Sequence, residues 1–238
     1  AFEDCTSLTS VTIHDSVTSI GNYAFYNCYK LVSIEIPDSV TSIGESAFNG
    51  CASIEYLLIP NSVTVVADNA FFGCSSLTNV VIPACVTNIG SGVFDGCASL
   101  AGIVVDEDNA TYRSLNGFLL SKDGTRLLDA PDGVIDVNVP AGVVSIGNGV
   151  FSGCDYLESV EFPDSVEEIG EYAFFNCAAL RTVLLNNQLE VAALDDAATN
   201  ELVQGIAAAI NKYIMALAKQ QIYLAFQSAE AVVNYLHQ

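Results

Sequence analysis

Hydrophobic and polar positions recur along this chain with a period of 23 residues. The segment Ala24–Ser46 realigns with Ala47–Asn69, and then with Ala70–Gly92, when it is shifted forward by that period. Self-similarity at a fixed period indicates a solenoid, in which each unit buries its apolar side chains only against its neighbours. The sequence therefore predicts a stack of similar coils.

Within one repeat the pattern reads A-F-x-x-C-x-x-L-x-x-V-x-I-P-x-S-V-T-x-I-G-x-x. Its V-x-I part alternates apolar and polar residues, as a half-buried strand does, so we expect Ile34 and Ile36 to point inward and Glu35 outward. Pro37 ends this strand because proline has no N–H to donate to a ladder. A second short extended piece then brings Val40 and Ile43 back to the core.

The A-F-x-x-C part follows a turn glycine such as Gly44, and we predict that it forms one short turn of helix with Phe25 and Cys28 facing inward. Cysteines of this type form a ladder, because they recur at the same place in successive coils. Seven members of one ladder cannot all pair, so the sequence predicts reduced, buried thiols. These cysteines are Cys5, Cys28, Cys51, Cys74, Cys97, Cys154 and Cys177.

Cys85 is different, because it replaces the serine of the P-x-S turn and should lie near the surface.

The repeated A-F-x-x-C, I-P-x-S-V-T and I-G elements resemble the BspA-like class of leucine-rich repeats, from Ala1 to about Leu185. The resemblance implies a right-handed, β-solenoid-like leucine-rich repeat fold with short β-strands and short convex helices. Members of this class are commonly exported and adhesive. The resemblance thus implies a surface or secreted module that binds protein or glycan partners.

The repeat register breaks after Val105 and resumes at Val137. We interpret residues 106–136 as an island inserted into the solenoid of residues 1–185. Two apolar runs, Phe118–Ser121 and Arg126–Asp129, flank an Asp-Gly pair, which is a strong signal for a β-hairpin.

A different composition, rich in helix-forming residues, begins at about Asp195 and predicts a C-terminal α-helical segment within residues 186–238. One apolar face runs from Leu202 to Leu217 and a second, rotated face from Ile222 to Leu236. Two roles compete for this segment. It could cap the last coil, whose core would otherwise be exposed. It could instead dock onto another chain, giving self-association or assembly into a larger complex.

The charge of the chain narrows the choice of partners. A formal net charge of −21 disfavours nucleic acids, which require clustered Lys and Arg. Several polar residues interrupt the apolar run Gly205–Phe226, so no membrane span is expected. The chain begins within a repeat, without an initiator methionine or signal peptide, and we expect it to be part of a longer protein.

The sequence offers little for catalysis. It contains no G-x-S-x-G or H-E-x-x-H motif, and its two histidines, His14 and His237, have no visible catalytic partner. The cysteines are not arranged in Cys-x-x-Cys pairs, which argues against zinc. We therefore expect no enzyme activity and no catalytic, cofactor or metal site.

Outward positions of the V-x-I strands supply the main candidate site. Tyr56, Leu58, Val81 and Val104 would form an apolar patch on an otherwise polar sheet face, and exposed apolar patches often bind partners. The alternative is that the island or the C-terminal helix covers the patch.

The island supplies a second candidate, because Arg113, Lys122 and Arg126 are three of the seven basic residues. These residues could mark a contact site on an acidic protein, or simply belong to a hairpin that extends one sheet.

Together these features favour a non-enzymatic, extracellular or cell-surface interaction module. The alternative is an intracellular structural subunit that docks into a complex through its C-terminal helix.

Overall fold

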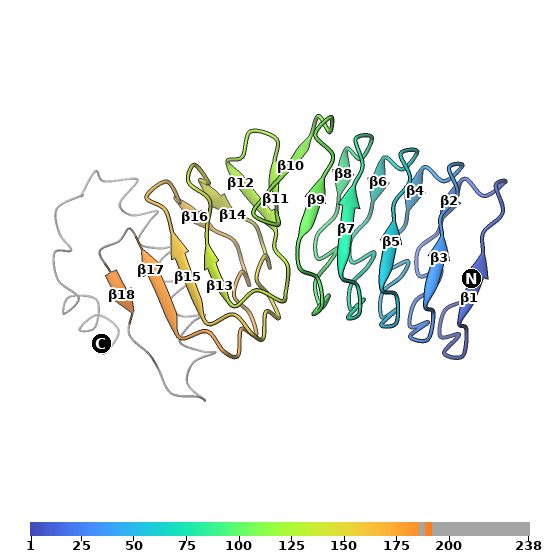
Figure 1. The fold of residues 1–238 in the computed structure, drawn as a ribbon, viewed down its shortest axis with the longest axis horizontal. Coiled ribbons are helices and arrows are strands. Elements are labelled where there is room, and N and C mark those ends of the chain that lie inside the picture. The colour runs from blue at the N-terminus through green and yellow to red at the C-terminus, as the bar shows by residue number, and fades with distance from the viewer. Residues whose placement is uncertain (186–188, 192–238) are drawn as a thin grey trace.

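The computed structural model describes residues 1–185 and 189–191. They form a β-solenoid of about eight turns, in which each regular coil contributes one strand to each of two rows (Figure 1). The predicted solenoid is therefore confirmed. An irregular segment near the middle divides the coils into an N-terminal and a C-terminal group.

The first row contains the V-x-I strands, here called the front row. In the N-terminal group these are β1 (Ser10–Thr12), β3 (Ser33–Glu35), β5 (Tyr56–Leu58), β7 (Asn79–Ile82) and β9 (Ile103–Val105). In the C-terminal group they are β13 (Asp136–Asn138), β15 (Ser159–Phe162) and β17 (Thr182–Leu185), followed by β18 (Leu189–Val191). Each coil-to-coil pair found in this row is parallel, whereas β17 and β18 are antiparallel.

The second row contains shorter strands. They are β2 (Ser19–Ile20), β4 (Ser42–Ile43), β6 (Val65–Val66) and β8 (Asn88–Ile89), then β14 (Ser145–Ile146) and β16 (Glu168–Ile169). Pairing in both rows follows the repeat, since each residue lies opposite the one 23 positions later, as Ser42 lies opposite Val65. Ile34 and Ile36 are buried and Glu35 is exposed, which confirms the predicted alternation.

The predicted short helices are wrong for the part of the chain that the structure describes, where each A-F-x-x-C segment is a series of turns. In the second coil Tyr23 and Asn27 adopt φ values of 55° and 58°, and the equivalent residues of most other coils are also left-handed. A right-handed helix cannot pass through such residues. The backbone N–H of Phe25, between them, donates to the carbonyl of Ala47 in the next coil.

Phenylalanine and cysteine side chains fill the interior of the coils, as predicted. The rings of Phe25 and Phe48 stack with their centroids 5.1 Å apart, and this stack extends to Phe94. The ladder thiols also bond between coils: that of Cys51 donates to the carbonyl of Phe25 at 3.2 Å. All the cysteines are free, and six of the seven ladder members are buried.

Cys5 is the exception to the prediction, because it is exposed. Its coil is the first one described, so no carbonyl of a preceding coil covers its thiol there. Cys85 is exposed, as predicted.

Close contact between coils explains two other residues that recur in the repeat, a glycine and a serine. A Cβ at Gly44 would lie 2.6 Å from the backbone nitrogen of Asn22, so only glycine fits there without movement. The serine of the P-x-S turn donates its hydroxyl to the preceding coil, as Ser39 does to the carbonyl of Val17 at 2.7 Å.

The predicted hairpin is present as β11 (Phe118–Ser121) and β12 (Arg126–Asp129), and a further strand, β10 (Tyr112–Leu115), pairs antiparallel with β11. β12 then pairs in parallel with β14, so the island joins the second row of the C-terminal coils. It also closes the edge of β9, where the N–H of Ile103 donates to the carbonyl of Gly117. The island thus replaces part of a coil.

The predicted C-terminal helix lies outside the described residues, as do both of its apolar faces. Within residues 186–238 only Leu189–Val191 is described, and it is a strand.

Burial of the ladder thiols leads to a direct test. Burial raises the pKa of Cys51 and of Cys177 to about 12, so these thiols should not ionise or react in the folded protein. With Ellman's reagent we expect two thiols, Cys5 and Cys85, to react in the native state and all eight after denaturation. A Cys5→Ser, Cys85→Ser variant is the control and should give no fast reaction. Rapid native labelling of a third thiol would contradict the structure.

Candidate functional site

The four residues of the predicted apolar patch lie together on the front row. β5, β7 and β9 are adjacent and in register, so that Leu58 lies opposite Val81, and Val81 opposite Val104. Tyr56 and Leu58 are 71% and 75% exposed, and Val81 and Val104 are 46% and 53% exposed. The alternative in which the island covers the patch is therefore wrong. We call these four residues the apolar strip.

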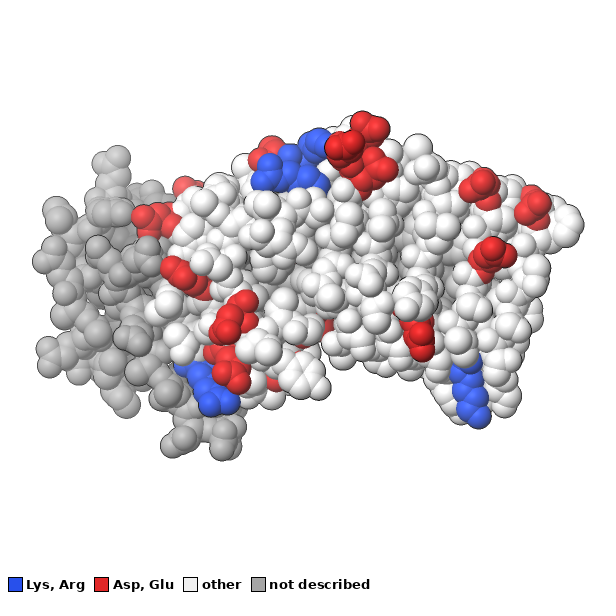
Figure 2. Space-filling view, viewed as in Figure 1, with Lys and Arg blue, Asp and Glu red and all other residues white. Residues whose placement is uncertain are grey.

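Acidic side chains flank the apolar strip along the row. The outward residue of the preceding coil is Glu35, which is exposed. On the other side, beyond the island, lie Asp136 on β13 and Glu161 on β15. Figure 2 shows an uncharged area over the middle of β5, β7 and β9, with red side chains over β3 and over β13–β15 and further red side chains beyond the ends of the three central strands. The sequence already indicated that acidic residues flank the apolar strip, because Glu35, Leu58 and Glu161 occupy the same repeat position.

Leu115 is an exposed residue that sequence reasoning missed. It ends β10, which contacts β9, and it is 38% exposed. Its position depends on how the island folds, which the repeat pattern does not specify.

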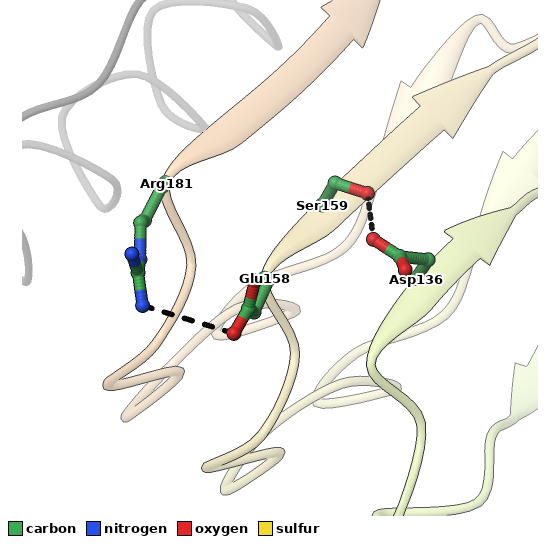
Figure 3. Close-up of polar contacts among 4 residues, drawn as sticks. All are labelled: Asp136, Glu158, Ser159 and Arg181. Atoms are coloured by element: carbon green, nitrogen blue, oxygen red, sulfur yellow. Dashed lines mark hydrogen bonds and ion pairs between the residues drawn. The ribbon is translucent and has the colours of Figure 1, made fainter.

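Two carboxylates on the C-terminal part of the front row contact neutral groups, whereas a third is paired with a base. Figure 3 shows one of the neutral contacts, between Asp136 and Ser159, and the ion pair of Glu158 with Arg181. Asp136 accepts a hydrogen bond from the hydroxyl of Ser159, and Glu161 accepts one from the side-chain amide of Asn138. In contrast, Glu158 lies 3.7 Å from the guanidinium of Arg181. Asp136 and Glu161 therefore keep an unbalanced negative charge.

The structure brings the three basic residues of the island together at one edge of the molecule, away from the centre of the apolar strip (Figure 2). Lys122 uses its ammonium group to bind the carbonyls of Glu107 and Asn109. Arg113 is half-buried, with its guanidinium against Gly124. Arg126 is exposed, and its guanidinium makes no bond within the described residues. Two of the three are thus held by the fold of the island.

Buried carboxylates form a second cluster, where the island meets the N-terminal coils. In a regular coil the N–H of the phenylalanine donates to a carbonyl of the next coil, as Phe71 does to Val93. At the island this next turn is missing, and the N–H of Phe94 instead favours the ionised form of the Asp129 carboxylate, lowering its pKa. The N–H groups of Gly96 and Cys97 act on the carboxylate of Asp132 in the same way. These side chains replace backbone carbonyls.

Asp132 also extends the ladder to the C-terminal coils. The thiol of Cys154 donates to Oδ1 of Asp132 at 3.6 Å, the role that a phenylalanine carbonyl plays for Cys97 and Cys177. One carboxylate thus interacts with both groups of coils. Oδ2 of the same carboxylate is buried and has no hydrogen-bond partner.

Burial makes these carboxyl groups weak acids. It raises the pKa of Asp132 to about 6. Asp95 is half-buried, and this partial burial together with the negative charge of Asp132 raises the pKa of Asp95 to about 7. Burial and the neighbouring charges raise the pKa of Asp129 well above its ordinary value. Sequence reasoning missed this cluster, because the missing turn that buries it appears only in three dimensions.

Asn109 belongs to an Asn-Ala-Thr triplet, the pattern of a glycosylation acceptor. Its side chain is fully buried, and Nδ2 donates to the carbonyls of Pro83 and Val86. The residue therefore ties the island to the preceding coil and is not accessible for glycosylation in the folded protein.

The rest of the described surface has little concavity and no site of obvious chemistry. A hollow of about 300 Å³ lies between the two groups of coils, with Asp95, Asn148 and Tyr172 in its walls. Among residues 1–185 and 189–191, no three His, Cys, Asp or Glu side chains gather so that they could hold a metal ion. In the same residues no helix is long and apolar enough to cross a membrane.

Comparison with protein families gives one match, to the BspA type leucine rich repeat region. Six copies of this repeat match residues 1–117 and 132–197, which leaves out residues 118–131, the part of the island that contains β11 and β12. Among curated proteins no match was found.

Solved structures with the same fold come from several bacteria. A leucine rich cell surface protein from Faecalibacterium prausnitzii is 34% identical, with a TM-score of 0.63 over 78% of this chain. The pneumococcal vaccine antigen PcpA is 26% identical, with a TM-score of 0.66 over 76% of this chain. A leucine-rich repeat protein from Eubacterium ventriosum, 23% identical with a TM-score of 0.59 over 76% of this chain, shows the fold alone. The chain spans 57%, 51% and 61% of these three proteins.

The raised pKa of Asp95 predicts a pH-dependent stability. Between pH 4 and 7 the folded protein keeps a proton on Asp95 that the unfolded chain, with a pKa near 3.8, has lost. The free energy of unfolding should therefore fall as the pH rises through this range. We expect Asp95→Asn to raise the melting temperature at pH 8 by at least about 2 °C and to leave it unchanged near pH 4.

Asp164→Asn, at an exposed turn, is the matched control and should leave the pH dependence as in the wild type. Identical melting profiles for Asp95→Asn and the wild type between pH 4 and 8 would contradict the proposed burial of this charge.

Proposed function

The chain belongs to the BspA-type leucine-rich repeat family, and from this premise we propose that it is a non-enzymatic interaction module that binds a protein through the apolar strip. The observation that supports the proposal is the exposure of Tyr56, Leu58, Val81 and Val104 on three adjacent strands. These outward positions contribute little to the core, which the alternate residues Leu57, Val80 and Ile103 fill.

The same positions in most other coils are polar, the exception being Leu184 on β17, which lies opposite Glu161. Thr12 and Glu35 precede the apolar strip in the row, and Asn138 follows it beyond the island. A solenoid face that needs only to be soluble would carry polar residues throughout, so the strip is a local departure from that pattern. Full burial of a large apolar side chain is worth about 1.5–3 kcal/mol. Four partly exposed ones would supply several kcal/mol to a complex.

We further propose that the protein acts outside the cell or at its surface. Supporting this is the likeness to a cell surface protein, 34% identical over 78% of this chain. The exposed guanidinium of Arg126 and the island residues Arg113 and Lys122 are proposed as a secondary contact at the margin of the binding face. The alternative function, assembly through a C-terminal helix or self-association, depends on residues outside those described.

Selection from a phage-displayed library of random peptides tests the proposed face. We expect the immobilised chain to enrich a set of peptides, and we expect Leu58→Ser combined with Val81→Ser to reduce their binding at least about tenfold. Serine removes apolar surface without adding charge. The melting temperature should stay within about 2 °C of the wild type, because both side chains are largely exposed.

Val65→Ser is the matched control, since Val65 points outward from β6 in the second row, and it should not change peptide binding. Enriched peptides that bind the double variant as well as they bind the wild type would place the binding face elsewhere.

A further inference from the structure

We infer that the partner of the apolar strip is a polypeptide segment in which a few apolar side chains are flanked by Lys or Arg. The inference rests on the proposed function and adds the chemistry of the partner. It follows from the order of side chains along the front row, where an uncharged apolar centre lies between carboxylates.

On the N-terminal side of the strip the nearest outward residue of the row is Glu35, which is exposed. Neighbouring strands lie about 4.8 Å apart, so the three aliphatic residues from Leu58 to Val104 extend over about 10 Å. A short peptide segment can cover this length. Beyond the island lie Asp136 and Glu161, so the face presents negative charge at both ends of the apolar strip.

The flanking carboxylates are free to attract a cation. Asp136 and Glu161 bond to the neutral side chains of Ser159 and Asn138, and within the described residues neither is paired with a basic group. Glu158 is the nearby carboxylate that Arg181 neutralises, and it serves as the contrast. Ionised side chains that face solvent without a counter-charge favour a partner of opposite sign and accelerate its association.

A second copy of the chain fits this face less well. Each copy has a formal net charge of −21, so two acidic faces would repel one another on approach. The aliphatic side chains of Leu58, Val81 and Val104 also favour a polypeptide over a glycan, because they offer no hydrogen bonds to sugar hydroxyls and leave Tyr56 as the one aromatic side chain of the strip.

Three synthetic peptides of equal length test the inference by fluorescence anisotropy with the whole chain. The first has alternating leucines flanked by two lysines at each end, the second has glutamates in place of the lysines, and the third has serines in place of the leucines. At about 50 mM sodium chloride we expect the first peptide to bind at least about tenfold more tightly than either of the others. This preference should shrink at about 500 mM, where exposed charges are screened.

Charge variants give the matched comparison. Combining Glu35→Gln, Asp136→Asn and Glu161→Gln should weaken the first peptide about tenfold and flatten its salt dependence. Glu167→Gln, Glu168→Gln and Glu171→Gln together remove the same charge at and beside β16 of the second row and should have less than about a twofold effect.

The outcomes separate this inference from the proposed function. Equal binding of the lysine and glutamate peptides, with both weakened by Leu58→Ser and Val81→Ser, would overturn the inference and leave the proposed face intact. If the serine variant instead has no effect on any bound peptide, both are wrong. Absence of binding by all three peptides would overturn the inference. So would a dimer in sedimentation that is lost in the Leu58→Ser, Val81→Ser variant, because it would identify a second copy as the partner.

Discussion

The stacking of one coil on the next imposes the constraint on which the rest of this structure depends. Backbone donors in each turn must find acceptors 22 residues further along the chain, as the N–H of Phe25 finds the carbonyl of Ala47. This requirement brings coils so close that Gly44 cannot carry a side chain without displacing Asn22. The stacked phenylalanines and the thiol ladder are further results of the same spacing. Side chains that point outward are not subject to this spacing, and their residue types differ from one repeat to the next.

The island shows how the constraint is met when a turn is missing. Buried donors left without partners are costly, so another acceptor has to occupy the place of the absent carbonyls. Asp129 and Asp132 do this with their side chains, at the expense of raised pKa values. A side-chain carboxylate can occupy the place of a missing backbone carbonyl even where the backbone of the island does not follow the path of a regular coil. The break in register therefore costs charge burial, and the carboxylates of Asp129 and Asp132 interact favourably with the N–H groups of Phe94 and Gly96.

Sequence reasoning predicted the features that repetition enforces. The 23-residue period predicted the solenoid, and the alternation of apolar and polar residues predicted that Ile34 points inward and Glu35 outward. The Asp-Gly pair predicted the hairpin. It failed where conformation depends on contact with another coil. The turn at Ala24–Cys28 was predicted to be helical, but the N–H groups of Phe25 and Asn27 donate to the next coil and Asn27 takes a left-handed conformation. The buried carboxylates were missed for the same reason, since Asp132 is an ordinary turn residue until the folded island encloses it.

The sequence also predicted part of the candidate binding face. Tyr56, Leu58, Val81 and Val104 share repeat positions, so their juxtaposition follows from the period alone. The sequence also showed the positive charges of Arg113 and Lys122. It could not show that the island itself binds these side chains, because that depends on contacts to Gly124 and to the carbonyls of Glu107 and Asn109.

The interrupted phenylalanine stack has a mechanical consequence. The rings stack continuously from Phe2 to Phe94 and again from Phe151 to Phe174, but the hydrophobic core is divided into two clusters at the island. In a solenoid each coil is held only by its neighbours, so tension along the axis is borne in series by every junction. We expect the junction at the island, where the two core clusters separate, to resist such tension least. A molecule pulled at its ends would yield there first, and each group of coils would remain folded as a separate elastic unit.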